Sequence, residues 1–285
     1  MTPRGETSAE PRAGHARDGE TPFVFEHDLD RSFLTSERID ELVRRAPDEE
    51  LIVQLADPGR ERPGLDRPIF THAQWPVLED ALARQIQYRI YNPHEWAEPE
   101  FRAWLDRIFE LAGPDPHLGR VNVTTVVRVF SPGAVVALHT DVDLKLVCTL
   151  SGETVWYVRP PEETTPVEHE DLLHGRFFLR WREGPDQALR IPPGHGCFVP
   201  CRWAHWLEHP GDEPVVSFEI GFWTYDSIRR RKVYDVNWGL RRLGLRPRPP
   251  GHPLDTAKCE LFDVASRLTG KVPQYRGRHR PPRRR

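Results

Sequence analysis

The chain has 285 residues, 38% of them hydrophobic and 29% charged, which suits one large domain or two ordinary ones. No stretch approaches the roughly 18 consecutive apolar residues of a membrane span. The N-terminal segment lacks the apolar region of a secretory signal, so we expect a cytoplasmic protein. Four cysteines in so long a chain do not form a disulfide framework, and we interpret them as reduced thiols.

The formal net charge of −3 is unevenly distributed. Residues 271–285 carry seven Lys or Arg and no acidic residue, so the rest of the chain is acidic. An acidic body argues against a nucleic-acid binder. We predict that the Pro-rich tail is disordered and solvated, with weak contact to nucleic acid or another acidic surface as its other use. Residues 1–21 have no apolar period and are also predicted to be disordered.

Between residues 22 and 118 the apolar spacing is mainly helical. A capping sequence at 35–37 precedes a short amphipathic pattern, and the segment 75–91 repeats that spacing. The pattern is strongest over 98–113, where Gly113 is placed to end a helix. We therefore predict a mostly helical N-terminal part.

At Val121 the apolar period changes from helical to two. Short runs of β-branched and aromatic residues follow as far as Trp223, separated by Gly, Pro and Asp turns. This pattern predicts an antiparallel sandwich or barrel, which we place at 119–225. Helical spacing then returns, and we predict C-terminal helices over 226–270.

His139 and Asp141 stand two residues apart at the end of an apolar strand, in SPGAVVALHTD. Side chains at i and i+2 lie on one face of a strand, so this pair can point together into a barrel. The pair makes two thirds of the two-histidine, one-carboxylate triad that holds Fe(II) and leaves coordination positions open. The spacing is not specific by itself, because His169 and Asp171 share it in a polar segment that we interpret as a loop.

The third ligand is predicted from residues 190–223. There a Pro-Gly turn precedes a strand that ends in Pro, and Trp203, His205 and a further strand to Trp223 follow. This arrangement places His205 on the opposing strand of a small barrel. His209 is interpreted as a surface histidine at a strand edge. His195, in a turn, is given no role.

These residues resemble the JmjC family of cupin-like oxygenases, which use iron and 2-oxoglutarate. HTDVDLKLVCTLSGETVWYVRPP matches the family's asparaginyl hydroxylases without a gap, from the His-x-Asp pair to the Pro-Pro pair. The resemblance covers about residues 121–223, and 229–251 look similar to the tails of bacterial cupin-like proteins. It implies a mainly β fold, a double-stranded β-helix core of the jelly-roll or cupin type between N-terminal and C-terminal helices. It makes His139, Asp141 and His205 the Fe(II) ligands.

One position departs from the family's pattern. Where the family supplies a Lys or Arg for the far carboxylate of 2-oxoglutarate, this chain has Thr154. A hydroxyl cannot neutralise a carboxylate, and a charge-assisted hydrogen bond is about twice as strong as a neutral one. Strand parity from Asp141 places Lys145 on the inner face, so Lys145 could replace the missing cation, with Arg128 as a second candidate. An exposed lysine at the start of a strand is the other interpretation of Lys145.

The resemblance implies an Fe(II)- and 2-oxoglutarate-dependent dioxygenase that hydroxylates an unknown substrate: a protein side chain, a peptide or a small metabolite. Two alternatives stay open: a non-catalytic cupin-like module that binds a metal or a ligand, and a cupin metalloenzyme that does not use 2-oxoglutarate. Thr154 favours both. Phe130, Trp156 and Trp223 are candidate walls of the site or ordinary barrel core.

The last helices carry apolar positions that could form a homodimer interface or pack against the barrel. These positions are Val233, Val236, Trp238, Leu240 and Leu243.

Overall fold

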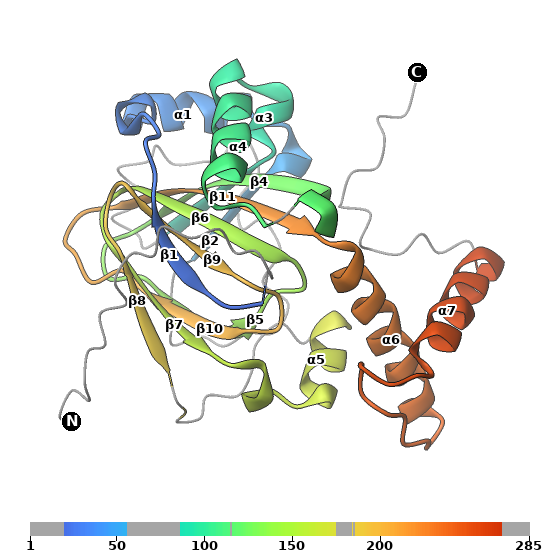
Figure 1. Ribbon diagram of the computed structural model, residues 1–285. Coiled ribbons are helices and arrows are strands. Elements are labelled where there is room, and N and C mark those ends of the chain that lie inside the picture. The colour runs from blue at the N-terminus through green and yellow to red at the C-terminus, as the bar shows by residue number, and fades with distance from the viewer. Residues whose placement is uncertain (1–19, 56–85, 115, 175–183, 185, 270–285) are drawn as a thin grey trace, which may run out of the picture.

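The computed structural model describes residues 20–55, 86–114, 116–174, 184 and 186–269. Their strands form two antiparallel sheets that face each other (Figure 1). The strands are β1 (Phe23–Glu26), β2 (Leu51–Leu55), β3 (Ile86–Tyr91), β4 (Val121–Phe130), β5 (Val135–Thr140), β6 (Leu144–Ser151), β7 (Thr154–Arg159), β8 (Gln187–Ile191), β9 (His195–Val199), β10 (Ala204–Glu208) and β11 (Val215–Trp223).

The larger sheet has the strand order β1-β9-β6-β11-β4-β3-β2, and the smaller sheet has the order β5-β10-β7-β8. From β4 to β11 the chain passes back and forth between the two sheets. This is the connectivity of a double-stranded β-helix, so the predicted fold is confirmed. The turn from β6 to β7 needs Gly152, whose φ is 67° and where a Cβ would come within 2.8 Å of the Pro214 carbonyl oxygen.

The helices flank this core at both ends of the chain (Figure 1). The predicted helix after the capping sequence is α1, where Thr35 accepts a hydrogen bond from the Arg38 N–H, and Gly113 ends α4 as predicted. The helices are α1 (Ser36–Arg45), α3 (Pro93–Trp96), α4 (Pro99–Ala112), α5 (Pro166–Leu173), α6 (Tyr225–Arg242) and α7 (Asp255–Thr269).

The helix predicted over 75–91 is wrong for its last six residues, which form β3; residues 75–85 lie outside the described part of the chain. Tyr88 and Ile90 are fully buried, and β3 pairs with both β2 and β4. The apolar residues of 86–91 fit both a helical period and a period of two. Pairing with β4 favours the strand. The segment 22–118 therefore supplies three strands of the larger sheet as well as helices.

The main hydrophobic core lies between the larger sheet and the N-terminal helices. Phe218 of β11 packs against Phe101 and Trp104 of α4, with ring centroids 6.0 Å and 5.4 Å apart. Each such fully buried aromatic side chain contributes about 2–3 kcal/mol. The opposite face of the same sheet looks toward the smaller sheet, and its side chains build the candidate site.

The C-terminal helices α6 and α7 pack on one another, and α6 also packs on α5 (Figure 1). Of the positions considered for a homodimer interface, Val233 is buried, Trp238 stacks on His174 at 3.7 Å, and Leu243 is exposed. Val233 and Trp238 therefore make contacts within the chain itself.

Among the described residues, no helix has the length and apolar character to cross a membrane. The ends predicted to be disordered, 1–21 and 271–285, lie outside the described residues except for positions 20 and 21.

Candidate metal centre

The structure brings the three predicted metal ligands together. His139 lies near the end of β5, Asp141 follows that strand, and His205 lies on the neighbouring strand β10, directly opposite His139. Their candidate donor atoms all lie within 4.8 Å of one another. His139 and His205, 66 positions apart along the chain, meet here because β10 pairs with β5 in the smaller sheet.

The two imidazoles are held in the tautomer that a metal requires. His139 Nδ1 lies 2.8 Å from the Ala137 carbonyl oxygen, and His205 Nδ1 lies 2.9 Å from the Trp203 carbonyl oxygen. A carbonyl oxygen can only accept, so each Nδ1 carries the proton and each Nε2 carries the lone pair. This backbone support of the second ring nitrogen is typical of metal-binding histidines.

Burial sets the charge of the three ligands. His205 is 1% exposed, and burial lowers its pKa; burial and then the neighbouring His205 lower the pKa of His139 to about 3. Burial opposes ionisation of Asp141, but the Lys145 ammonium, the largest attractive influence, holds its pKa below the usual range. The centre is therefore two neutral imidazoles and one carboxylate at neutral pH.

This donor set fits a divalent metal ion. His205 Nε2 lies 3.6 Å from the nearer Asp141 carboxylate oxygen and has no hydrogen-bond partner within the described residues. Buried polar atoms are normally satisfied, so an unpartnered lone pair beside a carboxylate is suited to bind a cation. The indole of Trp156 lies 5.0 Å from the His205 ring, centroid to centroid, and covers it from the interior.

Lys145 lies on the inner face of β6, opposite Gly221 of β11. Its Nζ is 3.2 Å from an Asp143 carboxylate oxygen. A Cβ at Gly221 would collide with the Asp143 carboxylate and come within 3.2 Å of the Lys145 Nζ, so this glycine makes room for the ion pair. Burial works against the Lys145 charge, but the carboxylates of Asp143 and Asp141 raise its pKa above the ordinary value.

Arg128 lies on the inner face of β4 and forms an ion pair with Glu219 of β11, with Nε 2.5 Å from a carboxylate oxygen. Its charge lowers the pKa of both His139 and His209, in each case after the larger effect of burial. Arg128 therefore lies within electrostatic reach of the metal ligands and of a second buried histidine.

His209 was predicted to be a surface histidine, and this is wrong: it is 1% exposed. It keeps the inner-facing parity of His205, and its ring stacks on Phe130 at 4.4 Å. Its Nδ1 is hydrogen-bonded to the Thr154 hydroxyl at 3.1 Å, while its Nε2 is buried without a hydrogen-bond partner in the described part of the chain. Thr154 thus lies next to His209, in the same interior as Arg128.

The segment around His169 was interpreted as a solvated loop, and this is also wrong. It forms α5, and His169 is 5% exposed because the helix packs against α6. The missed signal was local: the Thr165 hydroxyl accepts from the Glu168 N–H, and the Glu168 carboxylate accepts from the Thr165 N–H. This Thr-x-x-Glu capping box was readable in the sequence.

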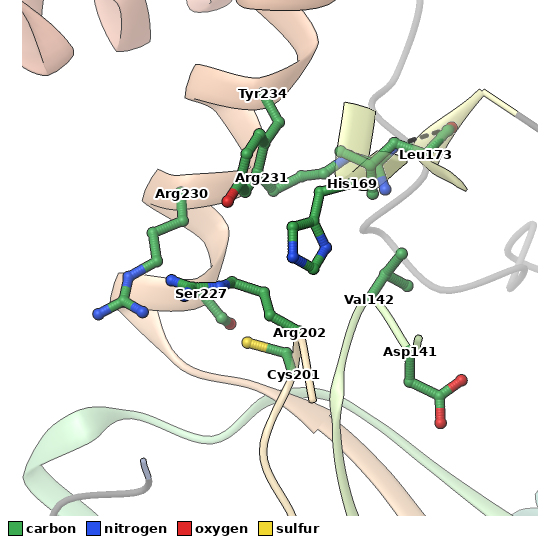
Figure 2. A pocket seen from close by; sticks show the side chains of 10 residues that line it. All are labelled: Asp141, Val142, His169, Leu173, Cys201, Arg202, Ser227, Arg230, Arg231 and Tyr234. Carbon is green, nitrogen blue, oxygen red and sulfur yellow. Dashed lines mark hydrogen bonds between the residues drawn. The ribbon is translucent and has the colours of Figure 1, made fainter. Parts of the chain in front are cut away.

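A pocket opens beside Asp141, where the loop after β5, the turn between β9 and β10, α5 and α6 come together (Figure 2). Figure 2 shows the Asp141 carboxylate directed away from the His169 ring. The residues that line the pocket are Asp141, Val142, His169, Leu173, Cys201, Arg202, Ser227, Arg230, Arg231 and Tyr234.

Other candidates lie away from the centre. His195 is on β9, with its Nε2 4.0 Å from a Glu26 carboxylate oxygen. All four cysteines are free, and burial raises the pKa of Cys148 and Cys197, so these groups are protonated thiols. Trp223 is buried at the end of β11.

No protein-family model matches the chain, and no curated protein matches it in sequence. Among solved structures it is similar to YcfD, a ribosomal oxygenase from Escherichia coli, in complex with cobalt and 2-oxoglutarate. The identity is 14% and the TM-score 0.49, over 90% of this chain and 65% of that one. AerE from Microcystis aeruginosa matches at 15% identity and a TM-score of 0.26, over 36% of this chain and 37% of that one. The function is therefore argued from the geometry of the site.

Proposed function

We propose that this protein is an Fe(II)- and 2-oxoglutarate-dependent oxygenase that hydroxylates its substrate. The proposal rests on one observation. Backbone carbonyls hold the rings of His139 and His205, and the candidate donor atoms of these rings and of Asp141 all lie within 4.8 Å of one another. His139, Asp141 and His205 would hold the metal. This ligand set favours Fe(II) and leaves positions open for other molecules.

When bound, the iron and 2-oxoglutarate supply the oxidising power, with dioxygen, to hydroxylate an unactivated C–H bond. The chain's own contribution is to hold and shield these groups. The Ala137 and Trp203 carbonyls keep the ligating rings in position, and the Trp156 indole excludes water on the interior side.

The interior beyond the metal ligands supports a polar cosubstrate. Arg128, Thr154 and His209 gather there, and the buried Nε2 of His209 lacks a partner among the residues described. A carboxylate placed between the sheets would satisfy that atom and face the Arg128 guanidinium. We assign the far carboxylate of 2-oxoglutarate to this group; the Thr154 hydroxyl would donate to His209 Nδ1 and so leave the ring proton on Nε2, facing the carboxylate.

Lys145 is the second candidate for that role. It is the largest attractive influence on the Asp141 carboxylate and is held by Asp143, which places its charge on the metal side of the interior. From there it is better suited to support Asp141 than to reach the Thr154 side. Its substitution is the comparison that separates the two assignments.

A second function is favoured by one specific observation. Both interior cations are already paired with carboxylates, Lys145 with Asp143 and Arg128 with Glu219. A metalloenzyme of the same fold that does not use 2-oxoglutarate would need no free cation, and this arrangement suits it.

We also propose a cytoplasmic setting, because buried free thiols are typical of a reducing compartment.

The test is anaerobic addition of Fe(II) and 2-oxoglutarate to the purified protein, followed by visible absorption and by calorimetric titration of 2-oxoglutarate into the Zn(II)-loaded protein. We expect a metal-to-ligand absorption band, saturable cosubstrate binding and succinate formation in air. Arg128→Gln should weaken 2-oxoglutarate binding by about tenfold or more, and Lys145→Ala by less.

Thr154→Val is the matched control, because it keeps the side-chain size and removes only a neutral hydrogen bond. A larger loss with Lys145→Ala than with Arg128→Gln would reverse the assignment of the cation. If millimolar 2-oxoglutarate produces neither a band nor heat, the cosubstrate proposal is wrong and the second function takes its place.

A further inference from the structure

The pocket beside Asp141 contains a cation that is not neutralised within the described residues. Arg230 is paired with Asp226 and Glu20, and Arg231 is paired with Asp235 and reaches the Leu173 carbonyl. Arg202, in contrast, has no carboxylate partner in the ranges the structure describes, and its Nε is buried without a hydrogen bond. A buried guanidinium nitrogen without an acceptor is costly, which makes Arg202 an anion-seeking group.

The backbone directs Arg202 into this pocket. The residue sits in the turn between β9 and β10 with φ at 75°, a left-handed conformation that favours Gly and Asn over Arg. Its N–H bonds to the Asp141 carbonyl oxygen at 3.4 Å, which fixes the turn against the metal-binding segment. Figure 2 shows the Arg202 side chain reaching toward α6, whereas the Arg230 guanidinium points away from the pocket.

His169 supplies a second, independent observation. It is 5% exposed, its ring stands in the middle of the pocket, and its Nε2 lacks a hydrogen-bond partner among the described residues. Burial, and then the charge of Arg202, lower the pKa of His169 to about 4, so the ring is neutral at physiological pH. The same cation acts on the buried Tyr234, which lines the α6 side.

We propose that this pocket binds a carboxylate group of the primary substrate, with Arg202 as its counterion and His169 as a further polar contact. A carboxylate matches the fork of a guanidinium in shape and charge. The inference rests on the proposed function, because a small carboxylic acid held by Arg202 would lie next to the Asp141 ligand. The substrate class that this pocket favours is therefore a molecule with a carboxylate group.

The test uses the full chain carrying Arg128→Gln and stripped of metal with a chelator, so that neither the metal centre nor the carboxylate site proposed at Arg128 contributes to binding. The probes are a series of carboxylic acids from acetate to 3-phenylpropionate, each compared with its primary amide by ligand-observed NMR. We expect at least one acid to bind about tenfold or more tightly than its amide. Arg202→Asn should abolish that preference, and Arg202→Lys should retain part of it.

Arg202→Asn is chosen because Asn tolerates the left-handed conformation, and thermal unfolding verifies that the variant is folded. Arg230→Gln is the matched control: it lines the same pocket, but its partners already neutralise it, so acid binding should not change. Equal binding of acids and amides would overturn the proposal, as would an acid preference that survives Arg202→Asn in folded protein.

The failure of this inference and the failure of the proposed function give different results. Acid binding that depends on Arg202, without an absorption band for Fe(II) and 2-oxoglutarate, upholds the pocket and rejects the oxygenase. A clear band without any acid preference upholds the oxygenase and rejects the carboxylate site.

Discussion

On its helix-covered face, the larger sheet presents apolar side chains such as Leu146 of β6 and Phe218 of β11. On the face toward the smaller sheet, the adjacent residues of the same two strands include Lys145 and Glu219. Successive residues of one strand thus alternate between a hydrophobic core and a charged interior.

The two faces have different roles: the helix-covered face stabilises the fold, and the inner face holds the groups that we propose for chemistry. The helix-covered face contributes burial, which scales with apolar area. The inner face carries buried ion pairs, which are weak evidence for stability because their desolvation offsets their attraction. Substitutions one residue apart should therefore have different effects: on stability at the helix-covered face, and on metal or cosubstrate binding at the inner face.

The largest effect is expected on the helix-covered face. Phe218→Ala should lower the free energy of unfolding by about 3–5 kcal/mol, because it removes a fully buried ring that packs against α4. Its neighbour Ser217 faces inward, and Ser217→Ala should change stability by about 1 kcal/mol or less. Urea unfolding of both variants measures the contrast, and equal losses would contradict it.

The second effect concerns the inner face. Asp141→Asn should weaken divalent metal binding by about 100-fold or more, because it removes the anionic ligand. Calorimetric titration with Co(II) or Zn(II) measures this. Asp171→Asn, from the other His-x-Asp pair, is the control and should leave metal affinity unchanged; similar losses in both variants would show that the triad is not the metal site.

The third effect is pH-dependent and depends on His209. Burial lowers its pKa to about 4 in the folded state, below the ordinary 6.5. The unfolded state therefore binds the proton first, so stability is fully present above pH 6.5 and declines toward pH 4. Between pH 7 and pH 4.5 this histidine should account for about 2–3 kcal/mol of that decline.

His209→Gln should accordingly show a shallower fall in unfolding free energy over the same pH range. Urea unfolding at a series of pH values compares it with the unsubstituted protein. Parallel pH curves for the two proteins would mean that His209 is not buried in the neutral form.

The smallest effect lies on the outer face of the smaller sheet. Tyr157 stacks on Trp206 with ring centroids 3.9 Å apart, and its hydroxyl donates to Glu208. A double-mutant cycle with Tyr157→Ala and Trp206→Ala should give a coupling of about 0.5–1.5 kcal/mol. Additive losses would show that the stacking does not contribute, and metal affinity should stay unchanged throughout.

Elements whose side chains alternate regularly between buried and exposed positions could be predicted from the sequence alone. The period-two pattern after Val121 predicted the strands of the barrel, helical spacing with capping residues predicted α1 and α4, and helical spacing alone predicted α6. The facing of Lys145 toward the interior also agrees with the parity counted from Asp141, although a turn separates the two residues. These features depend on the spacing of apolar residues along each helix or strand, because that spacing indicates which face of the element is buried.

Which element packs against each buried face, in contrast, depends on contacts that form only in the folded chain. Residues 86–91 became a strand because β4 offered its edge, and His209 and His169 became buried because distant elements packed over them. The meeting of Arg202 with α6 in one pocket likewise required the whole fold. A polar side chain carries no periodic signal of its burial, so its surroundings depend on contacts between residues far apart in the chain.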